Sequence, residues 1–359
     1  MLQTSRITFC GGRTQSFDHP TQARRFPRFA KRKNLFYENF YESNNTNGIL
    51  IVTQAADFTF WRRSKRENNI LIFDSNDPYL LDDSRSVKTI FRGLFKFVTG
   101  THKYFEFNYR KSFLKLCASS DCVIAGHYML YERLKPLVRN VVLIPDYSVD
   151  ADIEIKSRFE LGSNKVINIF WEGLGSSYLP FADINRIFQP LKGKYEFVFH
   201  FVTDLSFLSI GDKFNKKYTF EVAKSEAPEF YKSFRFYQWS EFSMNKIAVA
   251  CDFAIIPLPL DSSMNYFKPE NKLIHMWRMA IPTLVSAIPS YVHVMNQVGK
   301  EDYCYNDDDW RSKLLNFVES KDQRRDNANK GWNFANEFYS NERIDQMWSE
   351  VFKIVNSEN

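Results

Sequence analysis

The chain has 359 residues, of which 44% are hydrophobic, 17% aromatic and 25% charged, and 48 basic against 42 acidic side chains give a net charge of +6. These proportions exclude a disordered, collagen-like or coiled-coil chain. At about 150 residues per domain, the length predicts two globular domains.

Short apolar segments, rich in β-branched and aromatic residues, alternate along the chain with longer segments that are compatible with helices. This alternation is typical of strands buried on both faces of a parallel sheet and joined by crossover helices. The predicted strands of the first half are residues 6–10, 48–53, 69–74, 121–125 and 141–145. Those of the second half are residues 166–171, 195–201, 234–237, 252–257 and 283–286. The sequence therefore predicts two Rossmann-like, doubly wound α/β domains, residues 1–148 and 149–359, joined within 148–164.

The N-terminus is basic. Residues 1–40 carry eight basic and two acidic side chains, a surplus equal to that of the whole chain. Arg24, Arg28 and Lys31 or Arg32 recur at helical intervals, and Pro27 interrupts that pattern. Such a surface can bind phosphate, anionic lipid or an acidic substrate, and a solvated surface is the alternative.

Open parallel sheets bind ligands at the carboxyl ends of their strands, so the residues after each predicted strand are the first candidates for a site. In the first half, the turn at Gly12-Arg13 follows the first strand, Asp74 and Asp77 follow the third, and His127 follows the fourth. Glycines let the backbone approach an anion, and a histidine or carboxylate can move a proton. A plain turn, loop carboxylates and a structural histidine are the alternatives.

In the second half, Gly173 and Gly175 follow the first strand in a loop that leads towards a helix. The loop lacks the GxGxxG spacing, and no P-loop occurs, which disfavours an NAD site or a P-loop nucleotide site. Tyr237 and Trp239, at the end of the third strand, could stack on or hydrogen-bond a nucleotide base, and packing in the core is the alternative.

Residues 251–291 are the most informative segment. A strand ending in Pro257 enters a polar loop, and a helix from about Glu270 to Ala280 begins beside Lys268, Asn271 and Lys272. The helix dipole, the orphan N–H groups of its first turn and two ammonium groups together form a site for a dianion. A surface helix with unrelated lysines is the alternative.

These segments resemble glycosyltransferases of the GT-B fold, particularly the large retaining group that uses nucleotide-sugar donors. In that group a strand ending in Pro precedes a variable loop and a helix, and then come a small residue, a Pro and a strand, here Ala280, Pro282 and residues 283–286. Residues 120–127 resemble the last buried strand of the first domain, and residues 142–150 resemble the exit into the linker.

The resemblance implies that the N-terminal domain binds a glycan or lipid-linked glycan acceptor, which can be anionic. The C-terminal domain then binds the nucleotide-sugar donor, and a last helix at about 327–355 packs back towards the N-terminal domain. The implied donor-binding residues are Gly173, Gly175, Tyr237, Trp239, Lys268, Glu270, Asn271 and Lys272. The acceptor-binding residues that we infer are Gly12, Arg13, His19 and Arg24.

The chain departs from the retaining group at two positions. The usual pair of glutamates is replaced by Phe267 and His275, and Glu270 is the nearest carboxylate. We expect Glu270 to contact ribose or sugar hydroxyls. Lys268, Asn271 and Lys272 match a Lys-x-x-Asn-Lys pattern of a subset that lacks the pair.

Three residues are candidates for the chemistry. Lys272 would stabilise the leaving diphosphate together with Lys268 and the helix N-terminus, without a metal or other cofactor. His127 would contact the sugar or the donor phosphate, or act as the base of an inverting reaction. Asp74 is an alternative base, as is Asp77.

Five scattered cysteines without a CxxC pair indicate free thiols in a reducing compartment. The N-terminus lacks the apolar core of a secretory signal, so we expect a cytoplasmic protein, with a peripheral contact at the inner face of the membrane. No nucleic-acid motif occurs, and residues 307–309, three aspartates, are predicted as a solvated loop and not as a metal site. A sugar-nucleotide epimerase or hydrolase, and a non-catalytic basic binding protein, are the alternative functions.

Overall fold

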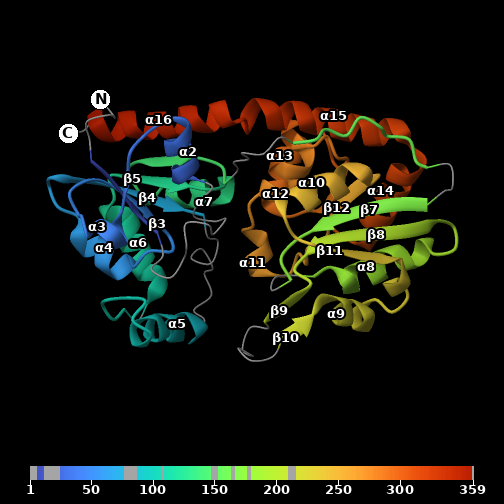
Figure 1. Cartoon of the computed structure of the whole chain (residues 1–359), viewed down its shortest axis with the longest axis horizontal. Helices are drawn as coiled ribbons and strands as arrows, with labels where there is room; N and C mark the ends of the chain where they lie inside the picture. The colour runs from blue at the N-terminus through green and yellow to red at the C-terminus, as the bar shows by residue number, and fades with distance from the viewer. Residues whose placement is uncertain are drawn as a thin grey trace. The chain divides into compact units, whose positions relative to one another are not determined.

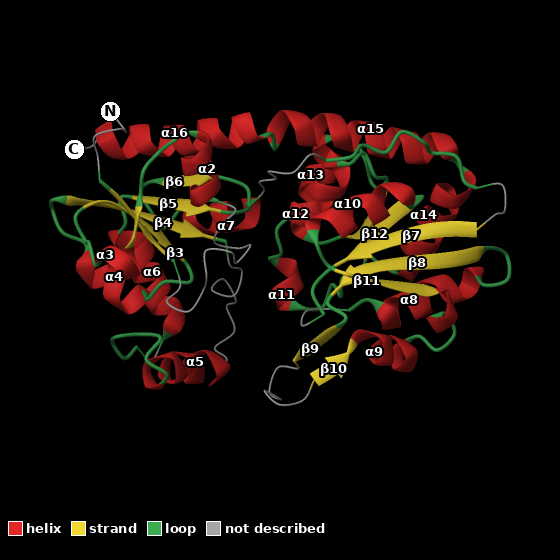
Figure 2. Ribbon diagram, in the orientation of Figure 1, coloured by secondary structure: helices red, strands yellow, loops and turns green. Residues whose placement is uncertain are grey.

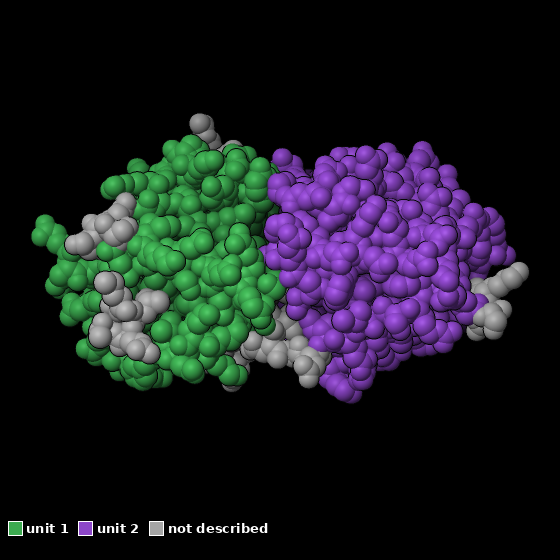
Figure 3. Space-filling view, turned by 90° about the horizontal axis from the view of Figure 1, so that it is seen from above, with its two compact units in different colours: residues 1–149, 267–269, 339–359 green, residues 150–266, 270–338 purple. Residues whose placement is uncertain are grey.

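The computed structural model describes residues 6–11, 25–76, 87–106, 108–146, 153–162, 166–175, 179–208 and 216–357. The chain divides into two compact units, which Figure 3 colours separately. Unit 1 comprises residues 1–149, 267–269 and 339–359, and unit 2 comprises residues 150–266 and 270–338. Each unit is an α/β sheet with helices on both faces (Figure 1).

The sheet of unit 1 has six parallel strands in the order β2-β1-β3-β4-β5-β6. Their bounds are β1 Ile7–Cys10, β2 Glu38–Asn39, β3 Gly48–Thr53, β4 Asn69–Ser75, β5 Cys122–Ala125 and β6 Val141–Leu143. The helices are α2 Phe26–Arg32, α3 Phe40–Ser43, α4 Phe58–Ser64, α5 Val87–Val98, α6 Tyr109–Ser119, α7 Tyr128–Leu134 and α16 Asn341–Ser357. The direction of winding reverses between β1 and β3, which is the switch point of a doubly wound sheet.

Both faces of this sheet are apolar, as parallel strands require. Leu50 of β3 packs with Phe58 of α4 and Phe113 of α6 on one face. Its neighbour Ile51 points to the opposite face, into a cluster with α2 and α16 that includes Trp348. The strand period of two residues thus supplies both layers of the core.

The sheet of unit 2 also has six parallel strands, in the order β11-β8-β7-β12-β13-β14. Their bounds are β7 Val166–Glu172, β8 Glu196–Thr203, β11 Phe234–Gln238, β12 Phe253–Ile256, β13 Thr283–Ser286 and β14 Tyr303–Cys304. A separate antiparallel hairpin joins β9 Ser206–Leu208 to β10 Lys216–Tyr218. The order is that of a dinucleotide-type Rossmann sheet, with its switch point between β7 and β12.

The helices of unit 2 form a layer on each face of its sheet (Figure 2). They are α8 Phe181–Phe188, α9 Thr219–Glu226, α10 Glu241–Ala250, α11 Ser263–Tyr266, α12 Asn271–Arg278, α13 Pro289–Gln297, α14 Asp307–Glu319 and α15 Lys321–Phe338. One buried cluster joins the sheet to α8, α9 and α14, and another joins it to α10 and α12. Among the described helices, none has the length and apolarity needed to cross a bilayer.

All ten predicted strands are present, each within two residues of its expected bounds. The prediction from the sequence did not include β2 and β14, which are two residues long, or the hairpin, in which β10 is exposed. The helix predicted over about 327–355 is two helices, because Ser340 accepts a hydrogen bond from the Arg343 N–H (3.2 Å) and starts α16 anew. The three aspartates at 307–309 form the first turn of α14, not a loop, where the helix dipole favours carboxylates.

Candidate functional site

Lys272, in the first turn of α12, lies at the carboxyl end of β7. Its Nζ donates to the backbone carbonyl of Glu172 (2.9 Å) and lies 3.8 Å from the Glu172 Oε1 atom. Its side chain is 35% exposed. Since β7 borders the switch point of the sheet, this places a solvent-accessible ammonium where doubly wound sheets bind ligands.

The glycines after β7 are required by close contacts. A Cβ atom on Gly173 would lie 2.9 Å from Lys272 Nζ and 2.6 Å from the ring of Trp171. At Gly175 a Cβ atom would lie 2.8 Å from the ring of Phe207, and the Gly175 N–H donates to Asp204 Oδ2 (3.0 Å). Glycine at 173 therefore leaves the space that Lys272 occupies.

Two carboxylates accompany the lysine. Glu270, at the N-terminus of α12, is buried, with 5% of its surface exposed. Glu172 has no assigned role in the sequence-based prediction, although it directly follows a predicted strand, the position where ligand-binding side chains are expected. Burial, together with the charges of Glu172 and Glu270, raises the pKa of the nearby Tyr291 hydroxyl. Burial lowers the pKa of His275 to about 4, although Glu172 acts in the opposite direction.

The remaining predicted donor residues lie in different places. Asn271 Oδ1 accepts from the Lys272 N–H (2.9 Å), within the first turn of α12. Tyr237 lies on the face of the sheet, where its hydroxyl is 3.1 Å from His200 Nδ1 and the two rings stack. Trp239 is half-buried at the carboxyl edge, and its backbone N–H donates to the Thr203 carbonyl (3.1 Å). Lys268 belongs to unit 1, whereas residues 270–272 belong to unit 2.

The position of α12 depends on α15. A Cβ atom on Gly331 of α15 would lie 2.4 Å from the ring of Trp277 of α12, so the two helices are in direct contact at this glycine. Substitution at 331 would therefore move the helix that carries Lys272.

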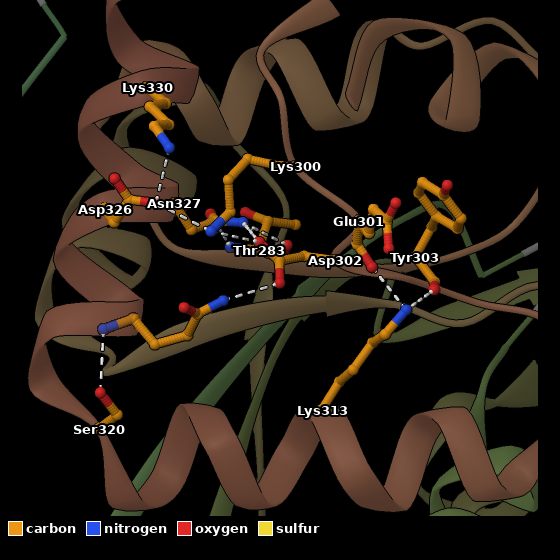
Figure 4. Close-up of polar contacts among 11 residues, drawn as sticks. Thr283, Lys300, Glu301, Asp302, Tyr303, Lys313, Ser320, Asp326, Asn327 and Lys330 are labelled. Atoms are coloured by element: carbon orange, nitrogen blue, oxygen red, sulfur yellow. Dashed lines mark hydrogen bonds and ion pairs between the residues drawn. The ribbon is translucent and has the colours of Figure 1, made fainter. Parts of the chain in front are cut away.

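A polar network fixes α15 to β13 and to the residues around β14 (Figure 4). Asn327 Oδ1 accepts from the Thr283 N–H (2.9 Å), and Asn327 Nδ2 donates to Asp302 (2.7 Å). Lys300 Nζ forms ion pairs with Asp326 Oδ2 (2.9 Å) and Asp302 Oδ2 (3.4 Å). The network is anchored on buried groups, so it holds α15, and through α15 the helix α12, in one position.

His127 is the N-cap of α7 and is fully buried. Its Nδ1 accepts from the Leu130 N–H (3.4 Å), and its Nε2 has no hydrogen-bond partner among the residues that the structure describes. Burial lowers the pKa of His127 to about 4, against the opposing charge of Asp146. At neutral pH the ring is therefore uncharged with its proton on Nε2, because Nδ1 is an acceptor.

Asp74, at the carboxyl end of β4, binds Arg25 through both oxygens, each 2.9 Å from Arg25 Nε. Arg25 also donates to the Ile144 carbonyl (3.1 Å) and lies 3.8 Å from Asp146. Burial alone would lower the pKa of the Arg25 guanidinium, but the carboxylate of Asp74 raises this pKa above its ordinary value. This buried pair favours a structural role for Asp74 over that of a base.

Among the described basic residues of the N-terminal segment, Lys31 and Lys33 are exposed and Arg28 is half-buried. Arg25 is buried, and Arg32 pairs with Asp345 of α16 (2.6 Å), with Lys33 at 3.7 Å from the same carboxylate. Pro27 stands at the start of α2 and does not interrupt it. The predicted acceptor residues, together with Asp77, lie outside the described residues: Gly12, Arg13, His19 and Arg24.

Unit 2 also has a cavity of about 140 Å³ beside the loop that follows β12, which the predicted donor residues do not line. Its walls come from residues 257–260, from Asp183 and Arg186 of α8, and from Asp307 of α14. No three His, Cys, Asp or Glu side chains come together as a metal site in the part of the chain that the structure describes.

No protein-family model and no curated protein sequence matches the chain. Solved structures do match it. TarM has a TM-score of 0.58 at 11% identity, over 86% of this chain and 54% of TarM. A TarM mutant from S. aureus, in complex with fondaparinux, alpha-GlcNAc-glycerol and UDP, gives 0.55 at 12% identity over 86% and 55%. The GtfA/B complex gives 0.54 at 11% identity over 92% and 60%.

The chain thus spans between a half and two thirds of the length of these structures. At such low identity the likeness concerns the fold. Two α/β units with parallel, doubly wound six-stranded sheets, matched over most of the chain by these structures, identify the fold of this chain as GT-B.

Proposed function

We propose that the chain is a glycosyltransferase that moves a sugar from a nucleotide-sugar donor to a glycan or lipid-linked glycan. The GT-B fold supports this, as does the S. aureus TarM mutant, whose structure contains UDP and alpha-GlcNAc-glycerol. The observation that carries the proposal is Lys272, which is partly exposed at the carboxyl end of β7 beside Gly173.

The diphosphate of the donor would bind at the N-terminus of α12. The Lys272 ammonium has three donors, and the Glu172 carbonyl takes one of them. The N–H groups at a helix N-terminus favour an anion, and those of α12 other than the Lys272 N–H, which donates to Asn271 Oδ1, would add to this site. Lysine and helix together would stabilise the charge that develops on the leaving diphosphate, a task that Lys268 would share and that requires no metal.

Glu270 and Glu172 are the proposed acceptors for ribose or sugar hydroxyls, since their carboxylates lie beside the same helix terminus. Gly173 and Gly175 would shape the loop under the diphosphate. Trp239, half-buried at the same sheet edge, is the proposed contact of the base. Tyr237 would support that edge through His200.

His127 is proposed as a hydrogen-bond donor to the transferred sugar and not as a base. Its Nδ1 already accepts from the Leu130 N–H, which leaves Nε2–H as the group to donate. Asp74 would act indirectly, because its ion pair with Arg25 braces the same sheet edge.

On the acceptor side, Gly12, Arg13, His19 and Arg24 remain proposed contacts of a glycan that can be anionic. A peripheral position at the cytoplasmic face of a membrane would bring a lipid-linked acceptor to the enzyme. A sugar-nucleotide epimerase or hydrolase would use the same donor site and differ in product.

The test starts with the donor. Thermal unfolding is followed with UDP, GDP, ADP, CMP and TDP, since a ligand at 100 times its Kd stabilises the native state by about 2.7 kcal/mol. With the donor identified, Lys272→Ala should lower kcat/KM by about a hundredfold or more, a loss of ~2–4 kcal/mol of transition-state stabilisation.

Lys224→Ala, on the exposed surface of α9, is the matched control and should leave kcat/KM unchanged. Unchanged kinetics in a folded Lys272→Ala protein would remove this site from the proposal. Stabilisation by a nucleotide without transfer to any acceptor, but with hydrolysis of the nucleotide sugar, would favour the hydrolase.

A further inference from the structure

The last turns of helix α5 in unit 1 differ from an ordinary surface helix, because they expose apolar side chains. Surface helices direct their apolar side chains to the core and their charges to water. Here Leu94, Phe95, Phe97 and Val98 are 42%, 60%, 42% and 73% exposed. Phe105, in the loop that follows, is 38% exposed, and its ring packs on the edge of Phe97. We call these five residues the α5 patch.

The described side chains of this segment that contact α6 are polar. Lys96 Nζ donates to the Tyr109 hydroxyl (2.6 Å) of α6 and lies 4.4 Å from the centre of that ring. His102 is buried, and its ring stacks on the same tyrosine. Among the described side chains, a lysine and a histidine therefore contact α6, whereas Leu94, Phe95, Phe97 and Val98 are exposed. Figure 2 shows α5 beyond α6, on the side away from the sheet.

The segment that carries the patch is strongly basic. Residues 87–115 contain seven lysines and arginines and one acidic residue, Glu106, which is paired with Arg62 of α4 (3.1 Å). Lys103 is exposed beside the patch and lies over the ring of Phe60 (5.2 Å). Arg63 lies over the ring of Tyr104 (4.2 Å). Exposed apolar side chains beside an exposed lysine, in a segment rich in basic residues, form the kind of surface that an anionic bilayer binds.

We propose that the α5 patch inserts into the interfacial region of an anionic lipid bilayer, with Lys103 and its basic neighbours on the headgroups. A convex row of phenylalanine, leucine and valine suits a fluid surface, into which such a helix sinks by a few ångströms. A second copy of the chain is a poorer occupant, because a two-fold interface would set this basic segment against itself. This surface differs from the N-terminal basic segment that the sequence suggests, in which Arg25, Arg32 and Lys33 are already paired.

The experiment is co-sedimentation with vesicles of phosphatidylcholine alone and of a phosphatidylcholine–phosphatidylglycerol mixture, each at low and high salt. It uses no sugar donor or acceptor, so its outcome is independent of the proposed transferase activity. We expect binding to the mixed vesicles, weakened by salt because exposed charges are screened. Phe95→Gln/Val98→Gln should lower the partition coefficient by about tenfold or more, since two apolar side chains no longer leave water.

The matched control is Phe36→Gln, which removes an 82% exposed phenylalanine elsewhere on unit 1 and should bind as the wild type does. Thermal unfolding checks that the two variants are folded, and all three substituted positions are exposed. No binding to the mixed vesicles, equal binding by the double variant, or equal loss in Phe36→Gln would each overturn the proposal. So would a dimer in solution that Phe95→Gln/Val98→Gln converts to monomer, because the patch would then join two copies.

Discussion

The polar groups at the carboxyl ends of the two sheets differ in their exposure to solvent. At the carboxyl edge of unit 1, Arg25, Asp74, Asp146 and His127 are all buried, with at most 6% of any residue exposed. At the carboxyl edge of unit 2, the Lys272 side chain is 35% exposed and has one short contact, to a backbone carbonyl. At the first edge Arg25, Asp74 and Asp146 contact one another, whereas at the second edge the Lys272 ammonium is partly exposed and lies 3.8 Å from Glu172. We therefore expect the buried charges to stabilise the fold and the Lys272 charge, as proposed above, to bind a ligand.

The largest effect expected from this difference is on stability. Arg25→Met leaves Asp74 buried without its partner and should lower the free energy of unfolding by about 3–5 kcal/mol. Lys272→Met removes a partly exposed, solvent-screened charge and should change it by about 0–1 kcal/mol. Urea denaturation of both variants measures the contrast.

The double variant Arg25→Met/Asp74→Leu is the control, since it removes both charges and should be less destabilised than Arg25→Met alone. Equal stability of Arg25→Met and Lys272→Met would mean that the buried ion pair contributes no more to the free energy of unfolding than the partly exposed lysine does. That result would contradict the prediction.

The second effect concerns what holds α12 in place. Gly331→Ala puts a methyl group within 2.4 Å of the Trp277 ring and should destabilise the protein by about 1–3 kcal/mol, although Ala favours helix by about 1 kcal/mol over Gly. The shift in α12 should also weaken nucleotide binding. Urea denaturation and nucleotide-dependent thermal shifts measure the two consequences.

A second substitution, Trp277→Leu, should restore part of the stability of Gly331→Ala, because it removes the ring that the new methyl group meets. Gly331→Ala with wild-type stability and nucleotide affinity would show that α15 does not set the position of α12.

The smallest effect is a pH dependence of unit 1. His127 has its pKa lowered from 6.5 to about 4, so between these values the unfolded chain binds a proton that the native state does not. Stability therefore falls as the pH falls through this range. From about pH 7 to about pH 5, His127 should account for about 1–2 kcal/mol of that loss.

His127→Asn tests this, since an asparagine at the N-cap can still accept from the Leu130 N–H and does not titrate. Urea denaturation at both pH values should show a smaller loss for the variant. The pKa of His275 is also lowered, so His275 contributes to the pH dependence of stability in both wild type and variant. An identical pH dependence in wild type and variant would mean that His127 titrates normally.

Local sequence was enough to predict the ten longer strands, and the resemblance carried by residues 251–291, 120–127 and 142–150 predicted the GT-B fold. Strands buried on both faces must be apolar along their length, so segments such as 48–53 and 252–257 are recognisable from composition, and the second forms a strand over Phe253–Ile256. The start of α12 was also predictable, since Pro269 and the residues around it indicate a helix N-terminus. Two-residue strands such as β14 were missed because so short an element has no pattern of its own.

The partners of the charged residues were decided by the tertiary structure. Lys272 and Glu172 are 100 positions apart, and Arg25 and Asp74 are 49 apart, so their meeting depends on which strand ends and helix termini the sheet order brings together. The same holds for Gly331, whose importance comes from Trp277 on another helix. A local pattern determines whether a segment is a strand or a helix, because that depends on near neighbours in the chain. Whether a cation is buried in an ion pair or left for a ligand depends on distant segments, and only the folded chain sets those contacts.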